Sequence, residues 1–213
     1  MSNSREALPE LLPRPRRFEI QVGRFRLRDG IPIVLDPSSS DGDFASACAL
    51  RDALLRSHGL RLPVETHARR DGIGPRIELR REAEAGEAYR LRVEDDHVLA
   101  VASGAAGLRY AVETLIQLVD PRGALPACLI DDAPDFPKRG IMLDVSRGKV
   151  PTPEALRALV DLCVRLKLNV LMLYVEHTFR FRRHPKIGAD ASPLEAEVLR
   201  ELYAPFLRTE KPF

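Results

Sequence analysis

The sequence predicts an α/β fold divided into two regions. In the first region, short strand-like segments are interspersed with two amphipathic helical segments, an order typical of a sheet layered with helices. In the second region, two apolar runs flank one amphipathic helix, the pattern of a parallel βαβ unit. We therefore expect a loose lead-in over 1–16, a first domain over 17–119, a linker over 120–138 and a second domain over 139–213.

The first domain opens with two strand patterns. Phe18 to Val22 alternates apolar and polar residues, and Ile31 to Leu35 is a short apolar run. From Asp43 the apolar residues instead recur every three or four positions, and Gly59 occupies the place of a helix C-cap. This spacing predicts a helix of four turns at most.

The rest of the first domain returns to strands. Segments 76–79, 88–93 and 97–102 have strand patterns, and an acidic turn between the last two predicts a hairpin. Ser103 is then placed to cap a second helix, whose apolar residues share one face as far as Val119.

The second domain has clear helix signals between its strands. Segments 141–145 and 168–175 are nearly continuous apolar runs, which predicts two buried parallel strands. Thr152 and Pro153 match the N-cap and first position of the helix between them. A further helix is expected to open at the capping-box sequence Ser192-Pro193-Leu194-Glu195 and to stop at Pro205.

Composition limits the partners and cofactors that we expect. The chain has 213 residues, is 45% hydrophobic and 30% charged, and carries a net charge of only +2, with basic residues scattered singly or in short pairs. This balance favours a globular protein without a nucleic-acid partner. The cysteines are odd in number and widely spaced, so we expect reduced thiols, no zinc site and no cofactor. They are Cys48, Cys128 and Cys163.

The N-terminal segment lacks the apolar stretch that a signal peptide requires, and no segment approaches the roughly 20 apolar residues of a membrane span. We therefore expect a cytoplasmic protein with no membrane partner.

Two stretches resemble a known enzyme family. The segment 135–147, DFPKRGIMLDVSR, is similar to the opening of the catalytic barrel in family 20 glycoside hydrolases, the β-N-acetylhexosaminidases. The segment 166–179, LKLNVLMLYVEHTF, resembles that barrel's second strand and loop, while 87–91 and 104–118 resemble the domain preceding the barrel. The resemblance implies a small α/β sandwich domain followed by the first two βα units of a truncated (β/α)8 TIM barrel.

The resemblance also implies a reaction. Family members hydrolyse a terminal β-linked N-acetylhexosamine with retention, using the substrate's acetamido oxygen as nucleophile and an Asp-Glu pair that follows the fourth barrel strand. A closed barrel needs about 250 residues, so the resemblance implies that this chain lacks the pair and is inactive alone. The implied partner is an N-acetylhexosamine-containing glycan. The alternative is a non-catalytic carbohydrate-binding or assembly module.

Two candidate binding residues lie in the first of these stretches. By resemblance, Arg139 binds hydroxyls of the terminal sugar, for which a guanidinium fork is suited; the alternative is a solvated arginine beside Asp135. Asp144 ends a buried strand, where an unpaired carboxylate is costly. It is therefore expected either to face the barrel mouth as a substrate ligand or to pair with Arg147.

Two more candidates, Glu176 and His177, follow the second strand at the face where barrel enzymes place their sites. We expect them to contact substrate; the alternative is a strand-end loop stabilised by His177. The pair Asp131-Asp132 is interpreted as a solvated acidic turn. Four histidines lack the spacing of metal ligands and are interpreted as surface residues. They are His58, His67, His97 and His184.

Overall fold

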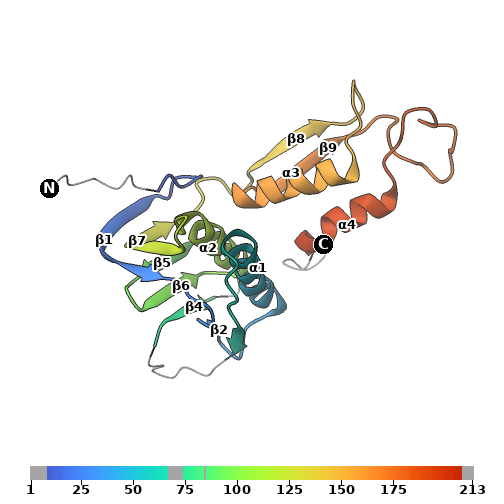
Figure 1. The fold of residues 1–213 in the computed structure, drawn as a ribbon. Coiled ribbons are helices and arrows are strands. Elements are labelled where there is room, and N and C mark those ends of the chain that lie inside the picture. Colours follow the sequence, from blue (N-terminus) through green and yellow to red (C-terminus); the bar gives the residue numbers. More distant parts are fainter. Residues whose placement is uncertain (1–8, 67–73, 84, 208–213) are drawn as a thin grey trace. The chain divides into compact units, whose positions relative to one another are not determined.

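The computed structural model describes residues 9–66, 74–83 and 85–207, and it divides the chain into two compact units (Figure 1). The first unit is Met1–Asp135 and the second is Phe136–Phe213. Each unit has its own cluster of buried apolar side chains, so each is built around a separate core.

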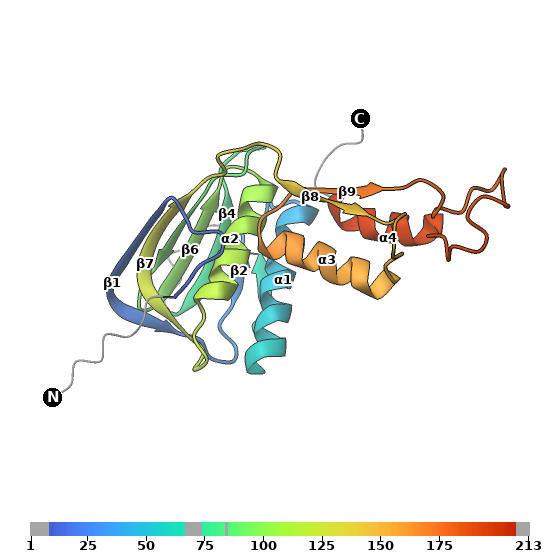
Figure 2. The ribbon, with the colours of Figure 1, turned by 90° about the horizontal axis from the view of Figure 1, so that it is seen from above.

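The first unit is a seven-stranded mixed sheet with two helices, α1 (Asp41–His58) and α2 (Ala105–Leu118), side by side on one face (Figure 2). The strand order is β1-β7-β5-β6-β4-β2-β3, with β5, β7 and β1 joined antiparallel and the β6-β4-β2-β3 part parallel. The strands are β1 (Arg17–Arg26), β2 (Ile33–Leu35), β3 (Val64–Thr66), β4 (Arg76–Arg81), β5 (Tyr89–Val93), β6 (His97–Ala102) and β7 (Ala124–Asp132).

Alternation along the strands builds this core. In β5, Tyr89, Leu91 and Val93 are buried, whereas Arg90 and Arg92 are exposed. Successive strand side chains point to opposite faces, so the apolar set packs under the helices. The predicted hairpin is confirmed, because β5 and β6 pair antiparallel with Tyr89 opposite Ala102.

The predicted linker over 120–138 is wrong for residues 124–132, which form β7 between β1 and β5. Pro126 made this segment look like a linker. It lies opposite Arg24, beside a register shift in β1, where a residue without an N–H is tolerated. The acidic pair is likewise not a solvated turn: Tyr89 Oη donates to Asp132 Oδ2 at 2.8 Å, and Asp131 pairs with Arg17.

The predicted loose lead-in is wrong for the residues just before β1. Leu11 is buried in the first core, and the Leu12 backbone N–H and C=O both bond the Gln117 side chain of α2, at 2.8 and 2.9 Å. Part of the lead-in is therefore integrated into the unit; residues 1–8 lie outside the described part of the chain.

Both helix starts in the first unit differ from those predicted. Helix α1 spans 18 residues, one turn more than expected, because Ser40 and Asp43 form a capping box at its start. Helix α2 begins after Gly104 without a side-chain cap, and Ser103 Oγ instead donates to the Ala88 carbonyl. A Cβ at Gly104 would lie 2.7 Å from the backbone of Gly86, so close loop packing replaces the cap.

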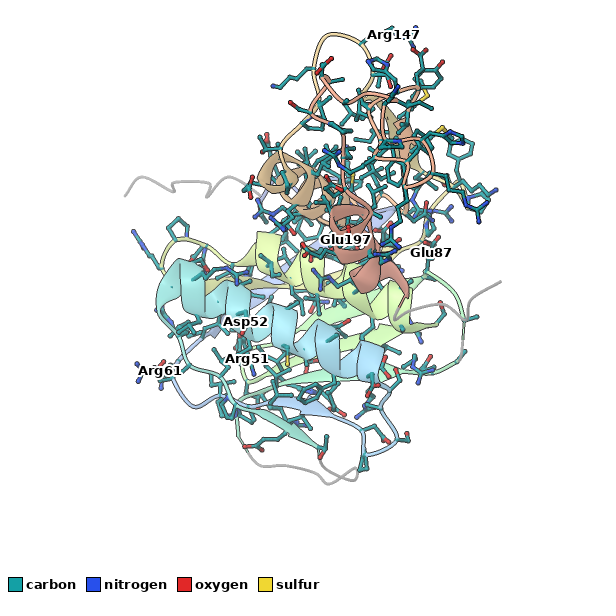
Figure 3. All side chains as sticks on the ribbon, turned by 90° about the vertical axis from the view of Figure 1, so that its right-hand side faces the viewer. Arg51, Asp52, Arg61, Glu87, Arg147 and Glu197 are labelled. Atoms are coloured by element: carbon teal, nitrogen blue, oxygen red, sulfur yellow. The ribbon has the colours of Figure 1, made fainter. Side chains whose placement is uncertain are left out.

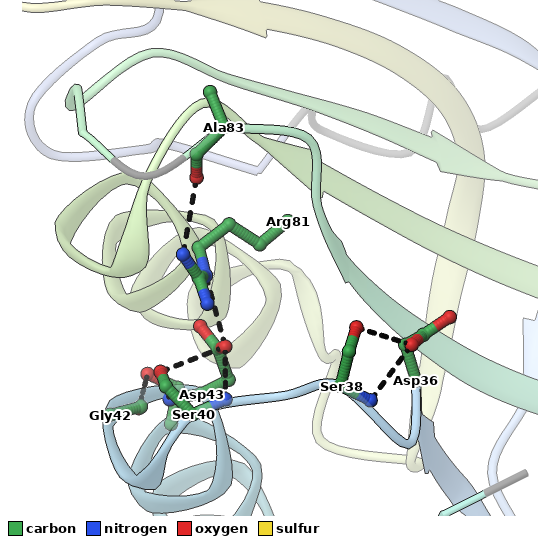
Figure 4. Close-up of polar contacts among 8 residues, drawn as sticks. Asp36, Ser38, Ser40, Gly42, Asp43, Arg81 and Ala83 are labelled. Carbon is green, nitrogen blue, oxygen red and sulfur yellow. Dashed lines mark hydrogen bonds and ion pairs between the residues drawn. The ribbon is translucent and has the colours of Figure 1, made fainter.

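Asp43 has a second role at the α1 terminus. Its side chain is 1% exposed, and Oδ2 accepts hydrogen bonds from Ser40 N at 2.8 Å and from Arg81 Nε at 3.0 Å (Figure 4). It thereby joins the start of α1 to the end of β4. Its Oδ1 is buried without a partner among the described residues.

The second unit is a βαβα arrangement. Strands β8 (Gly140–Asp144) and β9 (Val170–Tyr174) pair in parallel, with α3 (Pro153–Arg165) between them in sequence and α4 (Ala196–Leu207) after them. The predicted parallel pair and the start of α3 are confirmed: Thr152 Oγ1 accepts from Ala155 N at 3.2 Å, and Pro153 follows it.

The predicted start and end of the last helix are wrong. It begins at Ala196 rather than after Ser192, because Leu194 forms a bridge with Phe179 and its backbone N–H donates to the Thr178 carbonyl at 2.8 Å. It also extends to Leu207, beyond Pro205.

Only one face of the β8–β9 pair is covered in the described part of the chain. Val145 and Leu156 are buried in the second core, with Leu143 packed against them. On the other face, Met142 and Met172 are 63% and 55% exposed. This leaves an apolar strand face without a neighbouring layer among the described residues.

We predict that Asp43→Ala destabilises the chain by about 2 kcal/mol, because it removes a capping acceptor and leaves Arg81 without this carboxylate. Because Oδ1 has no hydrogen-bond partner among the described residues, its removal costs no further hydrogen bond, and we do not expect a larger loss of stability. Urea unfolding followed by circular dichroism measures the change. The matched control is Asp41→Ala, an exposed carboxylate in the same turn, with an expected loss below about 0.5 kcal/mol. Equal losses would contradict the role of Asp43.

Limited proteolysis should yield a resistant fragment that ends near Asp135 instead of Val119. Cleavage before β7 would remove the strand that hydrogen-bonds both β1 and β5, whereas cleavage near 136 removes no strand of the sheet. Mass spectrometry of the resistant fragment gives its end directly. A stable product that ends before Ala124 would overturn the assignment of β7 to this core.

Candidate functional site

The carboxyl ends of β8 and β9 bring acidic and aromatic side chains to one edge. The strands are parallel, and Asp144 at the end of β8 is directly opposite Tyr174 at the end of β9. Glu176 follows two residues later. Parallel strands place their carboxyl ends at the same edge, where barrel enzymes carry their sites. The structure therefore brings the predicted Asp144 and Glu176 to one strand edge.

Asp144 is held by three donors. Oδ1 accepts from the backbone N–H groups of Ser146 and Arg147 at 2.9 and 3.1 Å, and Oδ2 accepts from Arg147 Nε at 2.6 Å. These bonds, the Ser146 N–H first, hold the pKa of the Asp144 carboxyl below its ordinary value. The predicted ion pair with Arg147 is thus present, and Asp144 is a carboxylate at neutral pH.

Arg147 connects Asp144 to the second strand. It lies on a loop at one end of the second unit (Figure 3), and its Cζ is 4.9 Å from the centre of the Tyr174 ring, a cation–π distance. Tyr174 Oη in turn donates to Glu176 Oε1 at 2.9 Å, which raises the pKa of the Tyr174 phenol. We call Asp144, Arg147, Tyr174 and Glu176 the strand-end cluster.

Two hydroxyls hold the loops of the strand-end cluster together. Ser146 Oγ accepts from the Glu176 backbone N–H at 2.6 Å and lies 3.1 Å from Thr178 Oγ1, within hydrogen-bond distance. Thr178 is 2% exposed, so this contact lies below the surface of the site. The hydroxyl pair fixes the loop after β8 to the loop after β9.

His177 is exposed beside Glu176, and its side chain has no hydrogen bond among the residues that the structure describes. The loop is instead held at its backbone: a Cβ at Gly188 would lie 1.8 Å from the His177 carbonyl oxygen, so only glycine fits there. The alternative role of His177, stabilising this loop through its side chain, therefore receives no support from its contacts.

Arg139 lies at the other end of β8. Its Nε and Nη2 donate to the Lys167 carbonyl at 3.1 and 3.0 Å, and Nη1 donates to the Phe136 carbonyl at 2.6 Å. The structure does not bring Arg139 together with Asp144 and Glu176. It is also not solvated beside Asp135, which pairs with Arg16. Its contacts join the segment before β8 to the turn before β9.

Arg147 and Tyr174 were not predicted as site residues from the sequence. Arg147 was considered only as an ion-pair partner of Asp144. Because it lies only three residues after Asp144, its side chain also stays at the carboxyl end of β8. Tyr174 has the same parity in β9 as the exposed Met172, so period-two alternation was the signal that could have placed it on the uncovered face.

The prediction that the histidines are surface residues is wrong for His97. It is half-buried with Nε2 3.2 Å from Glu78 Oε2, and burial, followed by the nearby Arg76, lowers its pKa. His58 is also partly buried and bonds the Asp120 carbonyl. His184 is exposed, and His67 lies outside the described residues.

Within the described ranges, no cluster of three or more His, Cys, Asp or Glu side chains could hold a metal ion. In the same residues, no helix combines the length and apolar character needed to cross a membrane.

Comparison with known proteins supplies the family. A family model described as "Glycosyl hydrolase family 20, domain 2" matches residues 8–133. The β-N-acetylhexosaminidase of Cellulomonas fimi is 35% identical over 82% of this chain and 36% of its own length. The N,N'-diacetylchitobiase of Vibrio harveyi is 32% identical over 78% of this chain and 18% of its own length. The chain thus spans about a third or less of these relatives.

Solved structures agree with this likeness. The Streptomyces plicatus N-acetyl-β-hexosaminidase in complex with Thio-NAglucal aligns with a TM-score of 0.79 at 25% identity, over 93% of this chain and 44% of that one. The Vibrio harveyi GH20 exo-β-N-acetylglucosaminidase in complex with N-acetylglucosamine gives 0.79 at 20% identity, over 98% and 36%, which supports the fold alone. Since the family model covers more than half of the residues, the chain belongs to glycosyl hydrolase family 20.

Proposed function

We propose that the second unit is the first two βα units of a β-N-acetylhexosaminidase barrel, and that the strand-end cluster contacts a terminal N-acetylhexosamine. The observation that carries this proposal is the convergence of Asp144, Arg147, Tyr174 and Glu176 at one edge of a parallel strand pair. Relatives named for β-N-acetylhexosaminidase and diacetylchitobiase activity supply the substrate class.

The cluster offers the groups that a neutral sugar needs. Arg147 uses Nε for Asp144, and its two terminal nitrogens bond no other described residue, so they can donate to adjacent hydroxyls. Glu176 supplies acceptor oxygens, and the Tyr174 ring supplies an apolar surface. We also assign a sugar contact to His177, which is exposed beside Glu176. We assign Arg139 a positioning role because its side chain bonds backbone carbonyls at the opposite end of β8.

The same geometry argues against hydrolysis by this chain alone. A general acid must be protonated at the working pH, and enzymes raise carboxyl pKa values to achieve this. The pKa of Asp144 is shifted the other way, and its lone pairs already accept three hydrogen bonds. We therefore assign Asp144 to holding Arg147 in place. The Asp-Glu pair would have to come from further barrel strands.

A second candidate function is an assembly module. The uncovered face of β8 and β9, with Met142 and Met172 exposed, is the kind of surface that other strands and their side chains cover. In this alternative the chain associates with a polypeptide that supplies those strands. Sedimentation of the purified chain, alone and with a candidate partner, distinguishes the two functions.

We predict that the purified chain does not hydrolyse an aryl N-acetyl-β-glucosaminide above background. Leaving-group protonation alone typically contributes about 10²–10⁴-fold to such rates, and no described group in the cluster is shown to supply it. A chromogenic assay beside an intact family member provides the measurement. Activity that follows the protein through purification and disappears in Asp144→Ala would refute the proposal that the chain is inactive alone.

We also predict that Arg147→Gln raises the pKa of the Asp144 carboxyl without restoring its ordinary value. The variant removes the Arg147 charge and the Nε bond but retains both backbone donors, and the Ser146 N–H is the largest cause of the shift. Because the folded-state pKa is depressed, the stability that it supplies is present above the unfolded value and is lost as pH falls through the folded one.

Carbon-detected NMR titration of the Asp144 carboxyl measures this change. The matched control is Lys149→Gln, which removes an exposed positive charge from the same loop and should leave the Asp144 pKa nearly unchanged. Equal shifts in the two variants would mean that general electrostatics, and not the ion pair, sets the protonation of Asp144.

A further inference from the structure

A strongly basic loop follows the strand-end cluster. The segment 180–188, RFRRHPKIG, contains three arginines and one lysine with no acidic residue, whereas the whole chain has a net charge of only +2. The remainder of the chain therefore has no excess of positive charge.

The basic loop belongs to the same strand edge as the cluster. It begins four residues after Glu176. The chain segments that enter and leave the loop, which we call its neck, are joined by two backbone hydrogen bonds: Leu194 N donates to the Thr178 carbonyl at 2.8 Å, and Arg180 N donates to the Leu194 carbonyl at 3.1 Å. Thr178 also contacts Ser146 of the cluster's other loop. In Figure 1 the loop extends as the orange segment between β9 and α4. The neck thus anchors the loop to the hydroxyl pair beneath the site.

Part of this charge is neutralised within the unit. Arg180 pairs with Glu195, and Arg182 lies 3.6 Å from Glu197 of α4. By contrast, the exposed side chains of Arg183 and Lys186 have no ion pair or hydrogen bond among the described residues. Two cations of the loop that follows the cluster are therefore available to a ligand.

We infer that the basic loop binds an anionic substituent, a sulfate ester or a carboxylate, on the glycan whose terminal N-acetylhexosamine occupies the strand-end cluster. This inference rests on the proposed function. Guanidinium and ammonium groups are strong donors to both anions. Asp144 and Glu176 would repel an anion placed at the cluster itself, so the substituent lies on the loop side. The preferred substrate class is thus an acidic glycan.

The test is an NMR titration of the full chain at low salt with four probes. These are N-acetylglucosamine, N-acetylglucosamine 6-sulfate, a disaccharide of N-acetylglucosamine and a uronic acid, and inorganic sulfate. We expect one of the acidic sugars to bind about tenfold more tightly than the neutral sugar, with shifts at both Arg183 and Arg147, and to lose this advantage as salt is added. Whether the sulfated or the carboxylated sugar gains identifies the substituent.

Two double variants with the same loss of charge complete the test. Arg183→Ala with Lys186→Ala should abolish the tenfold preference. Lys138→Ala with Arg165→Ala, which removes exposed cations at the start of β8 and the end of α3, should preserve it. Backbone spectra of the free variants verify that they are folded.

The contrary outcomes separate this inference from the proposed function. Neutral and acidic sugars that bind equally while shifting Arg147 would overturn the anion preference alone. If the acidic sugars shift only the loop and inorganic sulfate binds as tightly as they do, the loop binds any anion without a sugar, which contradicts this inference. The proposed function fails separately, if N-acetylglucosamine also leaves Arg147 unshifted. An equal loss in both double variants would also overturn it, since the effect would then follow net charge and not the loop.

Discussion

The parallel register of β8 and β9 is the constraint on which the candidate site depends. It runs from Gly140 opposite Val170 to Asp144 opposite Tyr174, and a slip of one residue would move every side chain to the other face. Gly140 permits the approach of the strands, because a Cβ there would lie 2.0 Å from the Val170 carbonyl oxygen. Arg139 fixes the same end: its backbone N–H donates to Asn169 Oδ1, and its carbonyl accepts from Val170 N. The site at one end of the strands therefore relies on packing at the other.

This dependence explains which site residues the sequence could predict. Asp144 and Glu176 were predictable because one lies at the end of an apolar run and the other directly after one, and parallel strands align such positions. Arg139 is close to Asp144 in sequence, but a strand rises about 3.3 Å per residue, so the two lie at opposite ends. Arg147 and Tyr174 complete the cluster through a cation–π contact across the strand pair. Local spacing could place each of them at this end of its strand, but no local pattern encodes the contact between them.

The same distinction applies to the fold. Elements with strong periodicity and standard caps, such as α3 with Thr152, were predicted because the determining interactions lie within one turn. Strand β7 was missed because Pro126 and the acidic pair are usual in linkers, and only β1 and β5 give them strand partners. The start of α4 was missed for a similar reason. Leu194 forms a β-bridge with the distant Phe179, so it does not join the helix, which begins at Ala196. Long-range pairing overrode local propensity in both cases.

The charged groups at the carboxyl ends of β8 and β9 have different roles, and these roles follow from how each group is paired. Asp144 accepts three hydrogen bonds and keeps its proton affinity low, so it can orient Arg147 but cannot donate a proton to a leaving group. The ion pair also limits how strongly Arg147 attracts an anion, which suits the cluster to neutral hydroxyls. Arg183 and Lys186 have no such counter-charge among the described residues. In the proposed sugar site, an anionic group on the glycan therefore gains more from the loop than from the cluster. The two surfaces together favour a glycan that places neutral hydroxyls at the cluster and its anionic group at the loop.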